Sequence, residues 1–199
     1  MVPEGIPVFP LNVVLYPGGI LPLKIFEARY LDMVSECLRN NKGFGVCLIK
    51  SGREVGEAAT CEDTGTYARI IDWDRSSNGL LGITIQGEQR FRILQSQVLE
   101  NNLIMGTVDW LAKEVEVELQ PRYLVLQGMV ADLIMKYQLP FSTDPGRLND
   151  AVWLSYRLAE ILPISLNRKQ KLLVMDDSNE RMDKLHHWIS QLDQNSMLA

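Results

Sequence analysis

The sequence predicts an α+β protein in which a curled, mostly antiparallel β-sheet with one helix comes first and a helical bundle follows. Three observations lead to this prediction. Prolines interrupt the apolar run of the first 30 residues, which favours short, bent strands. Between residues 44 and 111, apolar segments of strand length alternate with polar turn signals. From Pro121 onward, the apolar residues recur at helical spacing.

Four prolines mark the first strands: Pro7, Pro10, Pro17 and Pro22. Because proline has no N–H to donate to a ladder, each one is expected at a strand start, an edge or a bulge. The sequence Pro17-Gly18-Gly19 predicts a tight turn, since glycine tolerates positive φ. The next strand places Leu21, Leu23 and Ile25 on one face.

Helical spacing begins near Glu27 and is expected to end at Asn40 to Gly43, where asparagine and glycine favour a helix exit. Further strands are expected over residues 44–50, 67–73, 81–93 and 103–111. Ser51 to Glu57 is predicted to be a surface loop, and Asp74 to Gly79 a hairpin turn. Gly87 lies where the long strand should bend or bulge.

Residues 112–118 change character, and from Glu114 to Glu118 they alternate glutamate with valine, which fits either a last strand of the sheet or an extended acidic connector. We place the boundary here, with a β-rich subdomain over residues 1–118 and a helical subdomain over residues 119–199. Helices are predicted from Pro121 and from about Leu148, and the second of these has two apolar faces. Ser165 is expected to cap a third helix, and Asp177 with Glu180 a fourth.

The composition is that of a globular protein, with 46% hydrophobic and 23% charged residues among 199. The net charge of −5 lacks the basic excess that nucleic-acid binding favours. No apolar run approaches the roughly 20 residues that span a bilayer, and the N-terminus does not resemble a signal peptide. We therefore expect a cytoplasmic protein without membrane contact.

No metal or cofactor is expected. The three cysteines, Cys37, Cys47 and Cys61, have no C-x-x-C spacing and are interpreted as buried, inert thiols. His186 and His187 are adjacent on a predicted helix, where neighbouring side chains point about 100° apart and cannot share a ligand on one face.

No catalytic residue is predicted either. The chain has no phosphate-binding Gly-x-x-x-x-Gly-Lys-Ser/Thr loop. Ser165 and Lys169 have helical spacing, but a capping serine and a surface lysine explain that pattern better than a catalytic dyad, which needs a desolvated lysine. A paired catalytic acid and base cannot be identified, so we do not expect an enzyme.

Three motif groups, in this order, resemble the Lon N-terminal domain family. The first comprises Pro10-Leu-x-Val-Val-Leu-Tyr-Pro-Gly18, Leu21-Pro-Leu23 and Ile25-Phe-Glu-x-Arg-Tyr30. The second comprises Gly65-x-x-Ala-Arg-Ile70 and Ile85-x-Gly87-x-x-Arg90-Phe91-x-Ile93. The third comprises Leu158-Ala-Glu-x-Leu162-Pro-Ile-Ser165, Lys169-Gln170-x-Leu-Leu173 and Asp176-Asp-x-x-x-Arg181. The resemblance extends from about Ile6 to Leu192 and is greatest to the stand-alone form, which lacks the ATPase and peptidase domains.

The resemblance implies a PUA-like pseudo-barrel for the β-rich part and a non-catalytic role in polypeptide recognition. The ligands would be unfolded or tagged protein segments, or a protease or chaperone partner. We expect a groove between the sheet and the helical arm that offers apolar surface or a free strand edge to an extended chain. Periodicity does not identify the residues that line it.

An alternative function is RNA binding, because some PUA-like modules bind RNA. Arg69, Arg90 and Arg92 would form the basic strip that RNA needs. Glu88 and Glu100 lie nearby, and arginines on the outer face of a strand are expected to be solvated or paired with carboxylates. The sequence therefore favours polypeptide over nucleic acid as the ligand.

Overall fold

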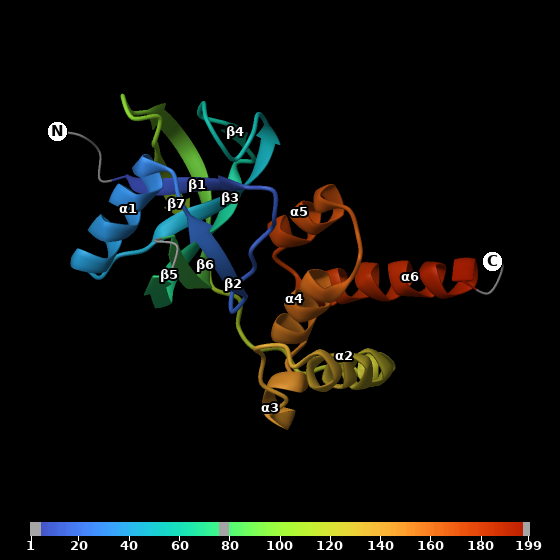
Figure 1. Ribbon diagram of the computed structural model, residues 1–199. Helices are drawn as coiled ribbons and strands as arrows, with labels where there is room; N and C mark the ends of the chain where they lie inside the picture. The colour runs from blue at the N-terminus through green and yellow to red at the C-terminus, as the bar shows by residue number, and fades with distance from the viewer. Residues whose placement is uncertain (1–4, 76–79, 197–199) are drawn as a thin grey trace. The chain divides into compact units, whose positions relative to one another are not determined.

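The computed structural model describes residues 5–75 and 80–196, in which the predicted α+β fold is confirmed (Figure 1). The chain forms two compact units, residues 1–113 and residues 114–199. The boundary that we predicted at residue 118 lies within the second unit, because Glu114 contacts Arg181 of the helical part, and Val117 and Glu118 contact Asp150.

The β-rich unit is a sheet closed into a barrel. Its elements are β1 (Ile6–Leu11), β2 (Ile20–Ile25), α1 (Ala28–Arg39), β3 (Phe44–Ser51), β4 (Thr60–Cys61), β5 (Thr64–Arg75), β6 (Leu81–Val98) and β7 (Ile104–Trp110). The strand order β1-β7-β6-β5-β3 closes through a parallel pairing of β1 with β3, while the other pairings are antiparallel. β2 pairs with β6 beside this ring, and β4 pairs with β3. The curled, mostly antiparallel sheet is thus confirmed, although β4 was not predicted.

The positions of the first two prolines follow from their missing N–H groups. β1 pairs with β7 over residues 6–8 and with β3 over residues 8–11. Pro7 and Pro10 therefore each lie where β1 has a ladder on one side. The turn at Pro17 is confirmed, with Gly18 at φ 76°.

α1 packs on the barrel through its apolar face, and Figure 1 shows it alongside β1 and β7. Tyr30 stacks on Phe9, with ring centroids 4.0 Å apart. Glu27 is the N-cap residue, and Asn41 at φ 50° follows the last turn, so both predicted ends of this helix are confirmed. The rest of this core consists of buried residues from α1, from five strands and from the segments before β2 and β7: Leu11, Leu15, Ile25, Met33, Val34, Cys37, Phe44, Val46, Ala68, Ile83, Ile85 and Leu103.

Gly87 allows the β1–β2 turn to approach β6 closely. Its N–H donates to the Gly19 carbonyl, and its own carbonyl accepts from the Gly18 N–H. A Cβ on Gly87 would overlap the carbonyl oxygen of Tyr16. The β5–β6 register shifts at this position, between the pairs Tyr67–Gln89 and Ala68–Gly87, so the predicted bulge is confirmed.

We predict that Gly87→Ala lowers the free energy of unfolding of the β-rich unit by about 2–3 kcal/mol, because the methyl group has no room beside a backbone carbonyl. Gly128→Ala is the control: nothing lies within 4 Å of a Cβ at this helical position, so we expect a gain of about 0.5–1 kcal/mol. Hydrogen exchange measured in increasing urea would report each unit separately. Equal stability of Gly87→Ala and the parent chain would contradict the close approach.

The helical unit begins with an extended connector rather than a last strand of the sheet. Its elements are a 3₁₀ turn (Pro121–Tyr123), α2 (Leu124–Tyr137), α3 (Pro145–Leu148), α4 (Ala151–Ile161), α5 (Leu166–Val174) and α6 (Ser178–Ser196). Asp150 joins the connector to α4, because its Oδ1 accepts hydrogen bonds from the backbone N–H groups of Val117 and Val152. The short α3 lies before α4, whereas the sequence predicted a single helix from about Leu148.

The predicted helix caps are confirmed. Ser165 Oγ accepts from the Arg168 N–H, and Asp177 Oδ1 accepts from the N–H groups of Asn179 and Glu180. α4 is buried on both of its apolar faces, as its sequence predicts. Two predictions fall on residues outside the described part: the Asp74–Gly79 turn from residue 76 on, and the apolar packing of the Leu192 side chain. Asp74 itself belongs to β5.

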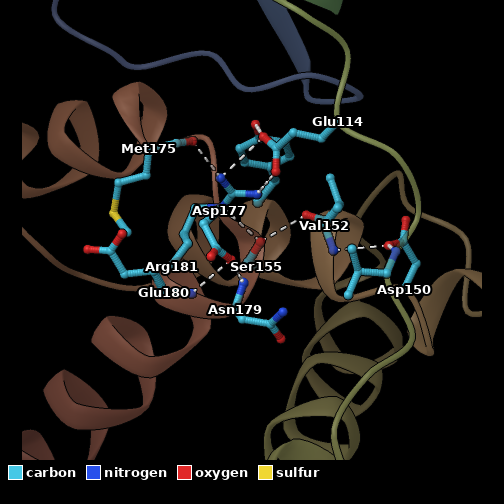
Figure 2. A network of polar contacts seen from close by, with 11 residues as sticks. Glu114, Asp150, Val152, Ser155, Met175, Asp177, Asn179, Glu180 and Arg181 are labelled. Atoms are coloured by element: carbon cyan, nitrogen blue, oxygen red, sulfur yellow. Dashed lines mark hydrogen bonds and ion pairs between the residues drawn. The ribbon is translucent and has the colours of Figure 1, made fainter.

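A buried ion pair connects the connector to three helices (Figure 2). The guanidinium of Arg181, in α6, makes a two-pronged contact with Glu114: Nη2 lies 2.7 Å from Oε2 and Nη1 lies 3.2 Å from Oε1. It also donates to Ser155 Oγ in α4 and to the carbonyl oxygen of Met175 after α5. Tyr156 donates its hydroxyl to Glu114 and stacks its ring under the guanidinium. Arg181 is fully buried, so this network fixes how these helices pack.

Candidate functional site

The β-rich unit contains an apolar cleft of about 580 Å³. Its floor is formed by β2, β6 and the last residues of β5, and its walls come from the end of β1, the start of α1 and the loop after β3. This volume lies in the range of sites that hold small ligands or single side chains. The lining residues are Phe9, Leu11, Pro22, Leu23, Lys24, Ile25, Phe26, Glu27, Tyr30, Glu54, Val55, Asp72, Trp73, Asp74, Gly82, Ile83 and Thr84.

Strand register explains why this floor is apolar. Trp73 lies opposite Ile83 in the β5–β6 ladder, and Ile83 lies opposite Leu23 in the β2–β6 ladder. Directly paired residues point to the same face of a sheet, so these three side chains form one row across the floor. Ile83 is buried, whereas Trp73 is 59% exposed at the end of the row. Phe26, 57% exposed, adds a second uncovered aromatic ring from the start of α1.

The loop after β3 forms one wall and is held by a hydrogen bond. The backbone N–H of Asn12 donates to Glu54 Oε1 at 2.6 Å. The next residue, Val55, is 52% exposed and lines the cleft. Gly52 and Gly56, both at positive φ, lie on either side of this contact and allow the loop to turn back.

The border of the cleft is acidic. Four lining residues carry carboxylates, namely Glu27, Glu54, Asp72 and Asp74, and one, Lys24, carries an amine. Glu27 pairs with buried Arg29 at 2.9 Å, and Asp72 Oδ1 accepts from the Trp73 N–H. The cleft therefore combines apolar surface with an excess of negative charge.

The lining residues do not form a catalytic group. Tyr30 is the lining phenol, and its burial raises its pKa to about 12, so it stays neutral at physiological pH. The lining set contains no serine, cysteine or histidine, and Thr84 supplies its aliphatic hydroxyl. An apolar, concave surface of this kind is typical of ligand-binding sites.

A match to a protein-family model identifies the family of this chain. The model of the ATP-dependent protease La (LON) substrate-binding domain matches residues 5–191. The chain belongs to this family.

Solved and curated relatives agree with membership of the LON substrate-binding domain family. The crystal structure of a Lon N-terminal domain protein from Xanthomonas campestris is 35% identical, with a TM-score of 0.78 over 93% of this chain and 98% of that one. The N-terminal domain of a Mycobacterium avium complex Lon protease shares the fold at 18% identity and a TM-score of 0.65, over 94% of this chain and 98% of that one.

The Lon protease of Dictyoglomus thermophilum is 25% identical over 209 residues, covering 96% of this chain and 25% of the relative. The Lon protease of Cytophaga hutchinsonii is 27% identical over 204 residues, covering 96% and 24%. This chain thus spans about a quarter of the length of these relatives. Within the described residues, no helix has both the length and the apolar character needed to cross a membrane.

The three arginines that RNA binding requires do not form an open basic strip in this LON-family chain. Arg69 pairs with Glu88 at 3.2 Å and donates to Asn41. Arg90 is buried, which excludes the solvated state, one of the two alternatives that the sequence left open beside pairing with a carboxylate. The alternation of a strand shows which face a side chain points to, but not whether another segment covers that face. Arg92 is exposed, as predicted.

Ser165 and Lys169 do not form a dyad. The Ser165 hydroxyl caps α5, and Lys169 Nζ donates to the carbonyl oxygen of Glu160 at 2.8 Å. Lys169 is half-buried, so the prediction of a surface lysine is only partly correct. Burial lowers its pKa, against the opposing effect of Glu160. The amine of this lysine therefore contacts the last turn of α4, which the sequence pattern did not reveal.

The remaining candidate ligands are in structural positions. Cys37 and Cys47 are buried, as predicted, and burial raises the pKa of Cys37 to about 11. Cys61 is half-buried, with its pKa also raised to about 11 by burial. The ring of His186 packs edge-on against Tyr123, and that of His187 contacts Gln191. Among the described residues, no three potential ligands are grouped as a metal site would need.

Sequence reasoning did not find the cleft. The alternation of Leu21, Leu23 and Ile25 identified one apolar face of β2, but it did not show that Leu23 and Ile25 line a cleft. The available signal was Trp73, a large aromatic residue between two aspartates at the end of a strand.

Proposed function

We propose that this chain is a non-catalytic polypeptide-recognition domain whose cleft binds the apolar side chains of an unfolded or extended protein segment. Membership of the LON substrate-binding domain family supports the general function. The observation that carries the proposal is the cleft itself, in which Trp73 and Phe26 are more than half exposed beside a concave apolar floor. Exposed apolar surface of this kind is typical of interaction sites.

The strands around the cleft also suit an extended ligand. Within the described residues, β2 pairs with β6 and with no second strand, and β5 after Ala68 likewise pairs with β6 alone. Such edges can accept backbone hydrogen bonds from an added strand while the cleft takes alternate side chains. Pro22 lacks an N–H, which limits pairing along β2 and favours the β5 edge.

The cleft lies entirely within the β-rich unit, so the proposal does not depend on the groove that we predicted between the two halves. Its ligand class follows from the same surface. Folded proteins bury their large apolar side chains, whereas unfolded segments present them. A tagged substrate, or a protease or chaperone partner, would bind here by offering a segment of this kind.

We predict saturable binding of an unfolded polypeptide. The test is fluorescence anisotropy with one labelled protein in two forms: natively folded, and reduced with its thiols blocked by a neutral reagent. The unfolded form should bind with a micromolar Kd, since a few buried apolar anchors supply about 8 kcal/mol. No binding of the unfolded form up to about 1 mM would contradict the proposal.

The same samples test the absence of catalysis. The bound polypeptide should be recovered intact after incubation with the pure chain, with or without ATP. Cleavage by the pure chain would overturn the non-catalytic function.

A further inference from the structure

We infer that the cleft selects segments in which a large apolar side chain is flanked by lysine or arginine. This inference rests on the proposed function and adds to it the chemistry of the ligand. It follows from where the carboxylates lie relative to the apolar floor.

Two aspartates lie on either side of the exposed anchor of the cleft. Asp72 and Asp74 precede and follow Trp73 in β5, and they lie opposite Thr84 and Gly82 of β6. All three β5 residues are exposed. Alternation places the Trp73 side chain on the cleft face of β5 and the two carboxylates on the opposite face. In a strand added along the β5 edge, the neighbours of an anchor residue opposite Trp73 would likewise point to the face of the two carboxylates.

Glutamates extend the negative border along both walls. Glu27 lies at the start of α1, and Glu54 lies in the loop after β3. Arg29 balances the charge of Glu27, and Glu54 uses one oxygen to hold the Asn12 N–H. Glu54 keeps its second oxygen for a further donor, because a carboxylate accepts several hydrogen bonds.

Spacing along an extended ligand matches this border. Consecutive residues in a strand are about 3.3 Å apart, so the neighbours of an anchor residue lie within reach of carboxylates on both sides of Trp73. Long, flexible lysine and arginine side chains can bring a cation to these carboxylates. An aspartate or glutamate next to the anchor of the ligand would be repelled by these carboxylates. This repulsion excludes competing segments as effectively as attraction selects the correct ones.

The test uses three synthetic peptides with the same central tryptophan and leucine anchors, flanked by lysine, serine or glutamate. At low salt, the lysine-flanked peptide should bind about 5–10-fold more tightly than the serine-flanked one, and the glutamate-flanked one more weakly still. At about 500 mM salt the differences should fall below about twofold, because exposed charges are then screened.

Variants that remove carboxylate charges test whether Asp72 and Asp74 cause the preference for lysine flanks. Asp72→Asn with Asp74→Asn removes two charges while an amide oxygen still accepts from the Trp73 N–H. This double variant should abolish most of the preference for lysine flanks, so that the lysine-flanked and serine-flanked peptides bind within about twofold of each other. The matched control, Glu100→Gln with Asp109→Asn, removes two exposed charges of the same unit that do not line the cleft, and it should keep the preference.

The outcomes separate the two proposals. Equal binding of the three peptides at low salt, or loss of the preference in the control variant, would overturn the inference about charge and leave the proposed function standing. Failure of all three peptides to bind would overturn the proposed function and the inference together.

Discussion

Arg181→Ala is expected to lower the free energy of unfolding of the helical unit by about 3–5 kcal/mol. The guanidinium is fully buried and contacts Glu114, Ser155 and the Met175 carbonyl oxygen. Its removal leaves a carboxylate without the positive charge that compensates its burial. The connector at Glu114 and the packing of α4 on α6 should both loosen.

The matched control is Lys184→Ala, one turn further along α6. Lys184 pairs with Glu180 at 3.0 Å, but both side chains are about half exposed, so its loss should cost at most about 0.5 kcal/mol. Native-state hydrogen exchange of the α4 and α6 amides would measure both variants without interference from the β-rich unit. A loss for Arg181→Ala no greater than that for Lys184→Ala would show that the network does not hold the helices together.

Trp73→Ala combined with Phe26→Ala is expected to weaken binding of an unfolded polypeptide by about 30-fold or more. Truncation of one central aromatic residue of an interface commonly costs about 2 kcal/mol, and such costs are not additive. Since tenfold in affinity corresponds to about 1.4 kcal/mol, a loss of about 2 kcal/mol for the pair gives about 30-fold as the lower bound. Both side chains are more than half exposed, so the fold should lose little stability. Anisotropy titrations with the same labelled polypeptide would measure the change.

The control for this pair is Leu94→Ala, an exposed apolar residue of β6 that does not line the cleft. Its removal should leave the affinity within about twofold of the parent chain, since isolated exposed apolar residues contribute little. Similar losses of affinity in the control and the cleft variant would indicate nonspecific binding to exposed apolar residues, and not binding at a defined site.

Local patterns in the sequence predicted most of the fold because local physics decides those features. The ends of α1, the caps at Ser165 and Asp177 and the bulge at Gly87 depend on backbone conformations that a few residue types favour. The prolines of β1 were interpreted correctly because a missing N–H restricts pairing wherever the strand lies.

Features that depend on distant segments could not be predicted in this way. Arg181 and Glu114 are 67 residues apart, and nothing near either residue indicates that the other will meet it in the interior. The burial of Arg90 and of Lys169 likewise depends on what covers them. The cleft depends on even more segments that are distant in the sequence. It exists only after the assembly of β1, β2, β5, β6, α1 and the loop after β3.

Photo-cross-linking tests most directly whether the cleft binds polypeptide. An unfolded segment that carries a photoreactive aromatic side chain at its apolar anchor would be bound to the full chain, irradiated, and the attachment sites mapped by mass spectrometry. The account predicts attachment at Phe26, Val55 and Trp73, and competition by the same segment without the photoreactive group. Attachment confined to residues 114–199, or scattered over the surface without competition, would contradict it.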